Sequence, residues 1–164
     1  MKQIHLERVT WDNYYAIMCL RVARGQRDFV APNEWSIVHA YAAQESGYAV
    51  YPFGIYCGKR PVGFAMAAFD PPFLGEGHPE PLKHSYWIWR FMIAKRYQGR
   101  GYGREALKLL VDFIKTFPAG KADTCWISYE PSNEGARHLY TSFGFVETPE
   151  YYEEVGEMPA CLKL

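Results

Sequence analysis

The sequence predicts a single mixed α/β domain spanning residues 1–164, in which helices pack on the faces of one sheet. The chain has 164 residues, a length that fits one domain. Short alternating or aromatic runs typical of strands are interspersed with longer runs whose apolar residues recur at helical spacing. Clusters of glycine and proline separate these runs and mark the turns between them.

The N-terminal half is expected to form a strand, two helices and a hairpin. Ile4–Val9 alternates between apolar and polar residues, as a half-buried strand does. Thr10 follows directly and can cap a helix that begins near Trp11. The later elements are a helix over Glu34–Gln44 and strands over Phe53–Cys57 and Val62–Phe69, joined by the short loop Gly58–Pro61.

The segment Asp70–His84 should form a long loop. It contains four prolines and two glycines, so we expect no regular element within it. Loops of about fifteen residues in compact domains are usually functional lids or disordered segments.

Strands and helices alternate again in the C-terminal half. Tyr86–Ile93 is aromatic and β-branched, which favours a strand. Gly101–Phe117 carries apolar residues at i, i+3, i+4 and i+7 and ends before Pro118, as an amphipathic helix does. The remaining expected elements are a strand at Thr124–Tyr129, a helix at Asn133–Phe143 ended by Gly144, and two strands near Phe145–Val155 and Ala160–Leu164.

The composition excludes several function classes. Eighteen basic residues balance 18 acidic ones, whereas a nucleic-acid-binding domain should be basic. The five histidines show no HxxxH or HExxH spacing, so we expect no metal. The chain has neither a signal-peptide run nor a stretch long enough to span a membrane, which predicts a cytoplasmic protein. A homodimer is compatible with the aromatic composition, although no sequence feature requires one.

The glycine-rich run YQGRGYG, residues 97–103, directly precedes the amphipathic helix. A helix N-terminus attracts anions through its unpaired amides, and glycines let the backbone approach a phosphate closely. The run lacks the Gly-Lys-Ser/Thr of a P-loop, and its GxGxG spacing differs from the dinucleotide fingerprint GxGxxG. Asp123 would also lie at the wrong sheet edge for a ribose contact. A tight turn without a ligand stays the simplest alternative.

Two motifs, which follow one another along the chain, favour a phosphate-binding turn because they resemble the signatures of a known family. Gln98–Gly103 matches Q/R-x-x-G-x-G/A, and Asn133–Phe145 matches N-x-x-A-x-x-L-Y-x-x-x-G-F. Both are signatures of the GCN5-related N-acetyltransferases (the GNAT superfamily), which the chain therefore resembles. Gly63–Met66 and Trp87–Ile93 are also similar to the small bacterial acetyltransferases of spermidine and spermine.

The resemblance implies a mostly antiparallel sheet that is splayed between its fourth and fifth strands, with helices on both faces. Acetyl-coenzyme A, the expected cosubstrate, would lie in the split. The backbone of Phe91, Met92 and Ile93 would pair with the pantetheine arm, and Asn133 would contact the cofactor, although Asn is also an ordinary helix N-cap. The pyrophosphate would be held by the turn residues Gln98, Gly99, Arg100, Gly101, Tyr102, Gly103 and Arg104.

The resemblance also implies that Tyr140 protonates the leaving thiolate, although its spacing equally suits a core tyrosine. Some relatives carry an acidic base on the fourth strand, but this chain has Trp89 there. Glu130 is then a candidate base, or else a solvated loop acid. Glu34 and Trp89 are candidates for binding a cationic substrate, the latter by a cation–π contact or else as a core residue.

The expected function is therefore transfer of an acetyl group from acetyl-coenzyme A to a primary amine of a small molecule by direct attack. A polyamine such as spermidine is the first substrate to test. The alternatives are acetylation of a protein N-terminus or lysine, and a non-catalytic module that only binds acyl-coenzyme A.

Overall fold

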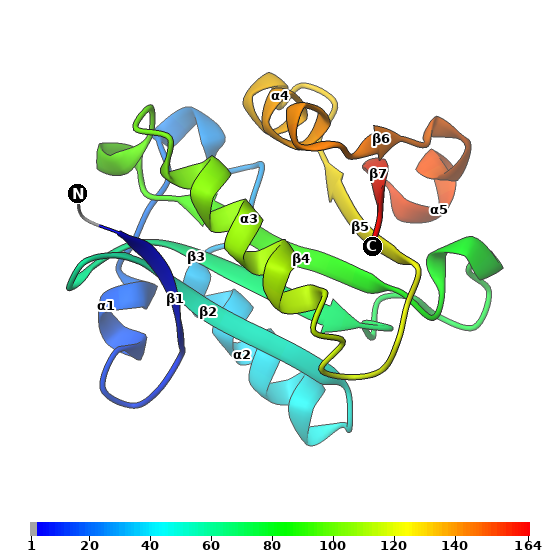
Figure 1. Cartoon of the computed structure of the whole chain (residues 1–164), viewed down its shortest axis with the longest axis horizontal. Helices are drawn as coiled ribbons and strands as arrows, with labels where there is room; N and C mark the ends of the chain where they lie inside the picture. Colours follow the sequence, from blue (N-terminus) through cyan, green and yellow to red (C-terminus); the bar gives the residue numbers. More distant parts are fainter. Residues whose placement is uncertain (1–2) are drawn as a thin grey trace.

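In the computed structural model, which describes residues 3–164, one seven-stranded sheet forms the centre of the chain (Figure 1). The strand order is β1-β2-β3-β4-β5-β7-β6, and every neighbouring pair is antiparallel except β4 and β5. The strands are β1 (Ile4–Arg8), β2 (Ala49–Cys57), β3 (Arg60–Phe69), β4 (Tyr86–Ile93), β5 (Thr124–Tyr129), β6 (Val146–Glu147) and β7 (Met158–Lys163). The helices are α1 (Tyr14–Met18), α2 (Asn33–Glu45), α3 (Tyr102–Ile114), α4 (Glu134–Phe143) and α5 (Tyr152–Val155).

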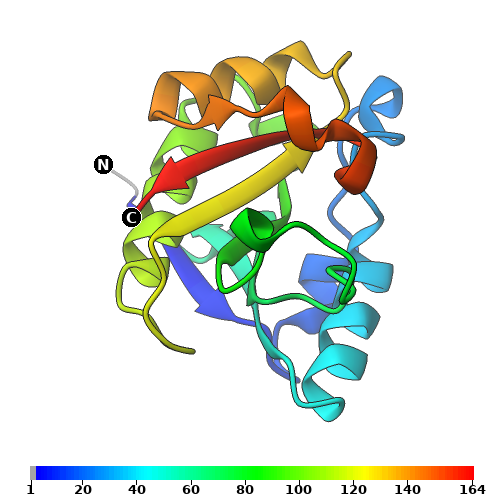
Figure 2. The same cartoon turned by 90° about the vertical axis from the view of Figure 1, so that its right-hand side faces the viewer.

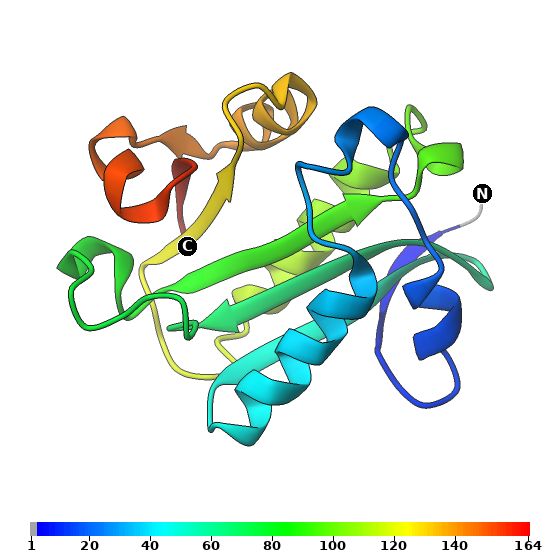
Figure 3. The same ribbon diagram turned by 180° about the vertical axis from the view of Figure 1, so that it is seen from behind.

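Helices cover both faces of the sheet (Figures 1 and 3). On one face α3 contributes Leu107, Leu110 and Ile114 to a large buried cluster that also includes Tyr140 of α4. On the opposite face Ile17 of α1 and Ala40 of α2 pack against inward-facing residues of β3 and β4. The two-sided packing explains why β3 is apolar almost throughout, since both of its faces are covered.

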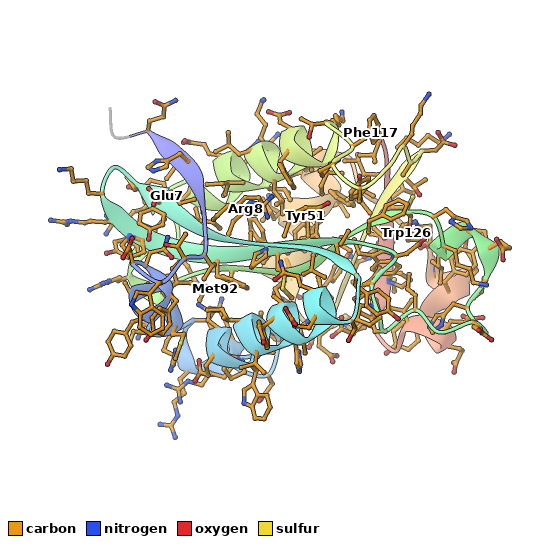
Figure 4. All side chains as sticks on the ribbon, turned by 90° about the horizontal axis from the view of Figure 1, so that it is seen from below. Glu7, Arg8, Tyr51, Met92, Phe117 and Trp126 are labelled. Atoms are coloured by element: carbon orange, nitrogen blue, oxygen red, sulfur yellow. The ribbon has the colours of Figure 1, made fainter. Side chains whose placement is uncertain are left out.

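Strand β4 separates the two layers. Ile88, Phe91 and Ile93 face the α3 side, whereas Met92 packs into the cluster beneath α1 and α2. Figure 4 shows Met92 on the α2 side of the sheet and Tyr51 on the α3 side. Both strands next to the expected split, β4 and β5, have the predicted bounds.

The C-terminal prediction is wrong over Phe145–Val155. Only Val146–Glu147 forms a strand there, followed by a 3₁₀ turn at Pro149–Tyr151 and the short helix α5. Pro149 lies at the start of the 3₁₀ turn, where its missing N–H costs nothing and its fixed φ suits a helical turn. The predicted strand near Ala160–Leu164 is present but begins at Met158.

Several other boundaries differ from the prediction. Helix α3 ends at Ile114 instead of Phe117, whose φ of +53° is not helical. Helix α1 begins at Tyr14, because Thr10 and Asn13 form a turn in which the Thr10 amide donates to the Asn13 side chain at 2.8 Å. The hairpin loop is shorter than expected, since Cys57 and Arg60 already pair. Strand β2 extends back to Ala49 because Ala49 pairs with Phe69.

The segment 70–84 is largely irregular, as predicted, apart from a 3₁₀ turn at Glu80–Leu82. Leu82 is fully buried, and its carbonyl accepts hydrogen bonds from the Ser85 hydroxyl at 2.7 Å and the Trp87 indole at 3.2 Å. The loop is thus fixed to the start of β4 and lies at the same end of the molecule as α5 (Figures 1 and 2). Among the described residues, no helix is both long and apolar enough to cross a membrane.

Close contact between β3 and β4 requires glycine at position 63. A Cβ atom there would clash with the carbonyl oxygen of Met92. We expect Gly63→Ala to destabilise the fold by about 1–3 kcal/mol, the usual cost of overpacking. The control is Gly25→Ala, where the added methyl meets nothing within 4 Å. Urea unfolding of both variants measures the difference, and equal stabilities would show that the two strands can move apart freely.

Candidate active site

Strands β4 and β5 pair only where they begin. Their parallel pairing comprises Tyr86 with Cys125 and Trp87 with Trp126, after which the two strands diverge (Figure 1). This confirms the predicted splay between the fourth and fifth strands. Across residues 3–164, the β5 side of Ile88–Ile93 has no strand partner. Backbone N–H and C=O groups on this edge are therefore available to a ligand.

A β-bulge lies in β4 beside the split. Met66 pairs with Arg90 and Ala67 pairs with Ile88, so Trp89 is an extra residue on β4. Bulges re-aim side chains and are common next to active sites. Here the bulge brings both Trp89 and Arg90 to the wall of a cavity.

Arg90 is a half-buried cation in that wall. Its Nη1 donates to the Trp89 carbonyl at 2.8 Å, whereas its Nε is buried and has no hydrogen-bond partner among the described residues. Burial lowers the pKa of Arg90, and the carboxylate of Glu157 opposes this effect. A buried donor without a partner is unusual and requires an explanation such as a bound ligand or water.

The glycine turn begins α3 at the end of the split. Gly99 and Gly101 have φ angles of +71° and +79°, a region that favours glycine. Gly101 precedes the helix and has no side chain to cap it, so the first amides of α3 are left for another partner. The side chain of Gln98 donates to the Ile93 carbonyl at 2.8 Å and to Gln26 at 2.8 Å, which fixes the turn to β4 and to the α1–α2 connection.

One cavity of about 750 Å³ joins the split, the glycine turn and the loop after β3. Eleven of the predicted site residues line it: Trp89, Phe91, Met92, Ile93, Gln98, Gly99, Gly101, Tyr102, Gly103, Asn133 and Tyr140. The opposite end of the cavity is formed by aromatic and acidic side chains, among them Phe73, Trp87, Trp89, Glu154 and Glu157.

Tyr140 lies in this cavity wall, deeply buried on α4. Its ring packs 5.5 Å from the ring of Tyr129 and 6.4 Å from that of Phe91. Burial raises the pKa of Tyr140, and the Tyr129 and Glu157 side chains raise it further. The phenol is therefore protonated at neutral pH and can act as a proton donor.

The end of β5 is held in place by a polar network. The Tyr129 hydroxyl donates to Glu147 at 2.7 Å, and Arg137 of α4 contacts the other carboxylate oxygen at 2.8 Å. The hydrogen bond from Tyr129 is the main cause that lowers the pKa of Glu147, and burial is the main cause that raises the pKa of Tyr129. This network fixes α4, and with it Tyr140, against the diverging end of β5.

Asn133 caps α4, as its residue type suggests. Its side chain accepts a hydrogen bond from the Ala136 amide at 3.2 Å. The same residue lines the cavity, so a ligand contact and the capping role are compatible.

Four predicted site residues do not line the large cavity. Glu34 contacts Arg21 at 3.1 Å and lines a neighbouring smaller cavity of about 240 Å³. Glu130 is half-buried, and its backbone carbonyl accepts a hydrogen bond from the Asn133 amide at 2.8 Å. Arg104 donates to Ser142 at 3.1 Å, and the Arg100 guanidinium lies 5.9 Å from the Tyr97 ring centre. The structure thus does not bring Glu130 or Glu34 together with Tyr140.

The structure also adds residues that sequence reasoning missed. Ser128, Glu154 and Glu157 line the cavity near Tyr140, and His78 joins them from the loop after β3. Glu154 lies within the segment whose conformation was predicted wrongly, Glu157 follows it, and no motif includes either residue. A correct assignment of α5 would have been the only available signal.

Comparison with known proteins identifies the family. A model of the acetyltransferase (GNAT) family matches residues 8–145. The chain belongs to the GNAT family. A spermine/spermidine N(1)-acetyltransferase of Bacillus subtilis strain 168 is 34% identical over 143 residues, which are 87% of each chain. Membership and this relative make the protein an acetyl-coenzyme A-dependent N-acetyltransferase.

Solved structures agree on the fold. An acetyltransferase from Thermus thermophilus superposes with a TM-score of 0.70 at 17% identity, over 98% of this chain and 97% of the other. RimL, a ribosomal L7/L12 α-N-protein acetyltransferase in complex with coenzyme A, gives 0.72 at 12% identity, over 100% and 96%. Such low identities show the GNAT fold alone.

The glycine turn provides a test of cofactor binding. Ala at a positive φ costs roughly 1–2 kcal/mol of stability. We expect Gly101→Ala to bind coenzyme A about tenfold more weakly, the value of roughly one hydrogen bond to a charged group. Isothermal titration of coenzyme A measures the affinity.

The matched control is Gly47→Ala at the end of α2, where φ is +89° and a Cβ also meets open space. It should lose similar stability and keep its affinity for coenzyme A. Equal affinities for the two variants would contradict a role of this turn in phosphate binding.

Proposed function

We propose that this GNAT protein transfers an acetyl group from acetyl-coenzyme A to a primary amine of a polyamine such as spermidine. One observation carries the proposal. A single cavity connects the glycine turn and the free edge of β4 with an acceptor end lined by acids and aromatic rings. Cofactor and amine would therefore meet beside Tyr140.

The cofactor would occupy the half of the cavity that is built from backbone. The amides at the start of α3, from Gln98 to Arg104, would hold the pyrophosphate. The free edge of Phe91, Met92 and Ile93 would pair with the two amides of the pantetheine arm. This arrangement would lead the thioester toward Tyr140.

The chemistry would be direct attack of the neutral amine on the thioester carbonyl. The amide of Met92 or Ile93 would polarise the carbonyl oxygen, as an oxyanion donor does. Collapse of the tetrahedral intermediate breaks the C–S bond, and Tyr140 would give its proton to the leaving thiolate. The phenol is protonated at neutral pH, as a proton donor has to be before the reaction.

The acceptor end of the cavity suits a linear cation. Its acids are Glu154 and Glu157, and the ring of Trp89 packs 5.3 Å from that of Phe73 and 6.1 Å from that of His39. Aromatic faces attract ammonium groups, and carboxylates pair with them. The Bacillus subtilis relative, named for spermine and spermidine, supports the same class of substrate.

Acetylation of a protein terminus or lysine is the alternative within the family. A protein substrate needs an open groove, whereas the loop after β3 places Phe73, Leu74 and His78 over the acceptor end. The His78 ring also contacts the Glu154 carbonyl at 3.2 Å, which connects the loop to α5. Because the loop covers this end of the cavity, a small amine is favoured over a protein substrate. The homodimer and the cytoplasmic location stay predictions.

A variant of Tyr140 distinguishes a catalyst from a protein that only binds acetyl-coenzyme A. We expect Tyr140→Phe to lower kcat by roughly 10²-fold or more, the usual contribution of a positioned general acid. Coenzyme A affinity should change little, because the cofactor contacts lie elsewhere. Tyr152→Phe, an exposed site on α5, serves as the control. Unchanged kcat in the Tyr140 variant would favour a different proton donor.

The substrate class is tested by a panel of amines. Release of free coenzyme A from acetyl-coenzyme A is followed for spermidine, spermine, short diamines, an aminoglycoside and a peptide with a free N-terminus, with mass detection of the product. We expect kcat/KM to be highest for the polyamines. Preferred turnover of the peptide or the aminoglycoside would discard the polyamine assignment and keep the reaction type.

A further inference from the structure

The cavity holds a carboxylate that no sequence motif indicates. Glu157 lies directly before β7, and the hydroxyl of Ser128 donates to its Oε2 at 2.7 Å. Ser128 is the penultimate residue of β5, at the diverging end of the split. Both side chains line the cavity, so the carboxylate is fixed at the mouth of the split instead of moving freely in solvent.

The charge of this carboxylate acts on two other groups that line the cavity. Glu157 acts electrostatically on the Tyr140 hydroxyl, whose pKa it helps to raise. It also acts on the Arg90 guanidinium, where its charge opposes the effect of burial. Because Tyr140 comes from α4 and Arg90 from β4, the carboxylate interacts with groups from both of these walls of the cavity.

The reaction needs a proton acceptor at this point. An alkylamine with a pKa near 10 is neutral in only roughly one molecule in a thousand at pH 7, and only the neutral form attacks. Strand β4 provides no acid, since the bulge residues are Trp89 and Arg90. The Arg90 cation disfavours a second positive charge nearby and thereby favours the neutral amine.

We propose that Glu157 accepts the proton that the substrate ammonium must lose before attack, while Ser128 holds the carboxylate in place. This inference rests on the proposed amine acetylation. The ammonium N–H bond breaks as the Glu157 O–H bond forms, and Glu157 later releases this proton to solvent. The freed lone pair forms the C–N bond, and the C–S bond then breaks. Tyr140 protonates the thiolate and recovers a proton from the nitrogen of the new amide.

The other acids near the split are placed less well. Glu154 is exposed on α5, and Asp28 is exposed on the α1–α2 connection. Glu130 is not among the residues that line the cavity. Among the acids that line the cavity, Glu157 is the half-buried one, and the Ser128 hydroxyl orients it by a hydrogen bond.

Other titratable groups share this end of the cavity and have to be separated from Glu157 in any pH experiment. From the surrounding elements they are Arg90 of β4, Tyr129 of β5, Tyr140 of α4, His78 of the loop and Glu154 of α5. The histidine is tested by a variant of its own, because imidazole has the reference pKa nearest to neutrality.

The test is the pH dependence of kcat/KM for wild type and Glu157→Gln, measured from about pH 6.5 to 8.5. When a carboxylate removes the proton from the ammonium form, kcat/KM is nearly independent of pH between the pKa values of the two groups. Without the carboxylate only free neutral amine reacts, so kcat/KM should rise about tenfold per pH unit. At pH 7 we expect the variant to be lower by roughly 10²-fold.

Three further variants make the result specific. Glu153→Gln, an exposed neighbour on α5, should keep the wild-type rate and slope. His78→Gln should keep the flat slope. Ser128→Ala frees the carboxylate and should give a smaller loss with an intermediate slope. If Glu157→Gln does not fold, as judged by thermal unfolding, Ser128→Ala decides the question.

Two outcomes would overturn the inference: a tenfold slope already present in wild type, or a uniform loss in Glu157→Gln with the slope unchanged. The second result would assign Glu157 to substrate binding or structure. The profile is recorded with the best amine of the panel. Acetylation of a different amine with the expected slopes would discard polyamine specificity and keep Glu157, whereas polyamine turnover with equal slopes would do the reverse.

Discussion

The divergence of β4 and β5 after two residue pairs is the constraint on which the rest of the site depends. A sheet that continued to pair here would use the backbone groups of Ile88–Ile93 and leave nothing for a ligand. The rings of Trp87 and Trp126 stack at the last pair, 5.9 Å apart, and fill the apex of the split. Beyond the apex, β5 pairs fully with β7, so the backbone of β5 is satisfied on its far side. The split is therefore built into the packing and does not require a ligand to open it.

The bulge in β4 is the second feature of the sheet that shapes the cavity. It lets one strand contribute side chains to the core beneath α2 and to the cavity within three residues, through Met92, Trp89 and Arg90. The buried Nε of Arg90 has no partner in residues 3–164, which costs stability and serves no purpose in the core. Such a cost fits a group whose charge acts on the contents of the cavity.

The sequence predicted strand β4 and the glycine turn beside it well, because both are encoded locally. Strand β4 is recognisable from its aromatic residues, and the turn from glycines that positive φ values require at Gly99 and Gly101. The acids that line the cavity were not predicted, because contacts between residues distant in sequence place them there. Glu130 was chosen because it follows a strand, yet Glu157, 27 positions later, is the acid that Ser128 holds in the cavity. No local pattern reports a hydrogen bond between residues of two different strands or their ends.

This division also explains how GNAT proteins can share a fold and differ in acceptor. Backbone amides and a free strand edge tolerate most substitutions, and structures only 12–17% identical to this chain keep the same fold. The end of the cavity that we propose for the acceptor is formed largely by side chains of two separate segments: the loop 70–84 and the residues before β7. These segments lie outside β4 and α3, and none of their residues takes part in the pairing between β4 and β5. They can therefore change independently of the glycine turn and the free edge of β4, and in the proposed function their side chains select the amine.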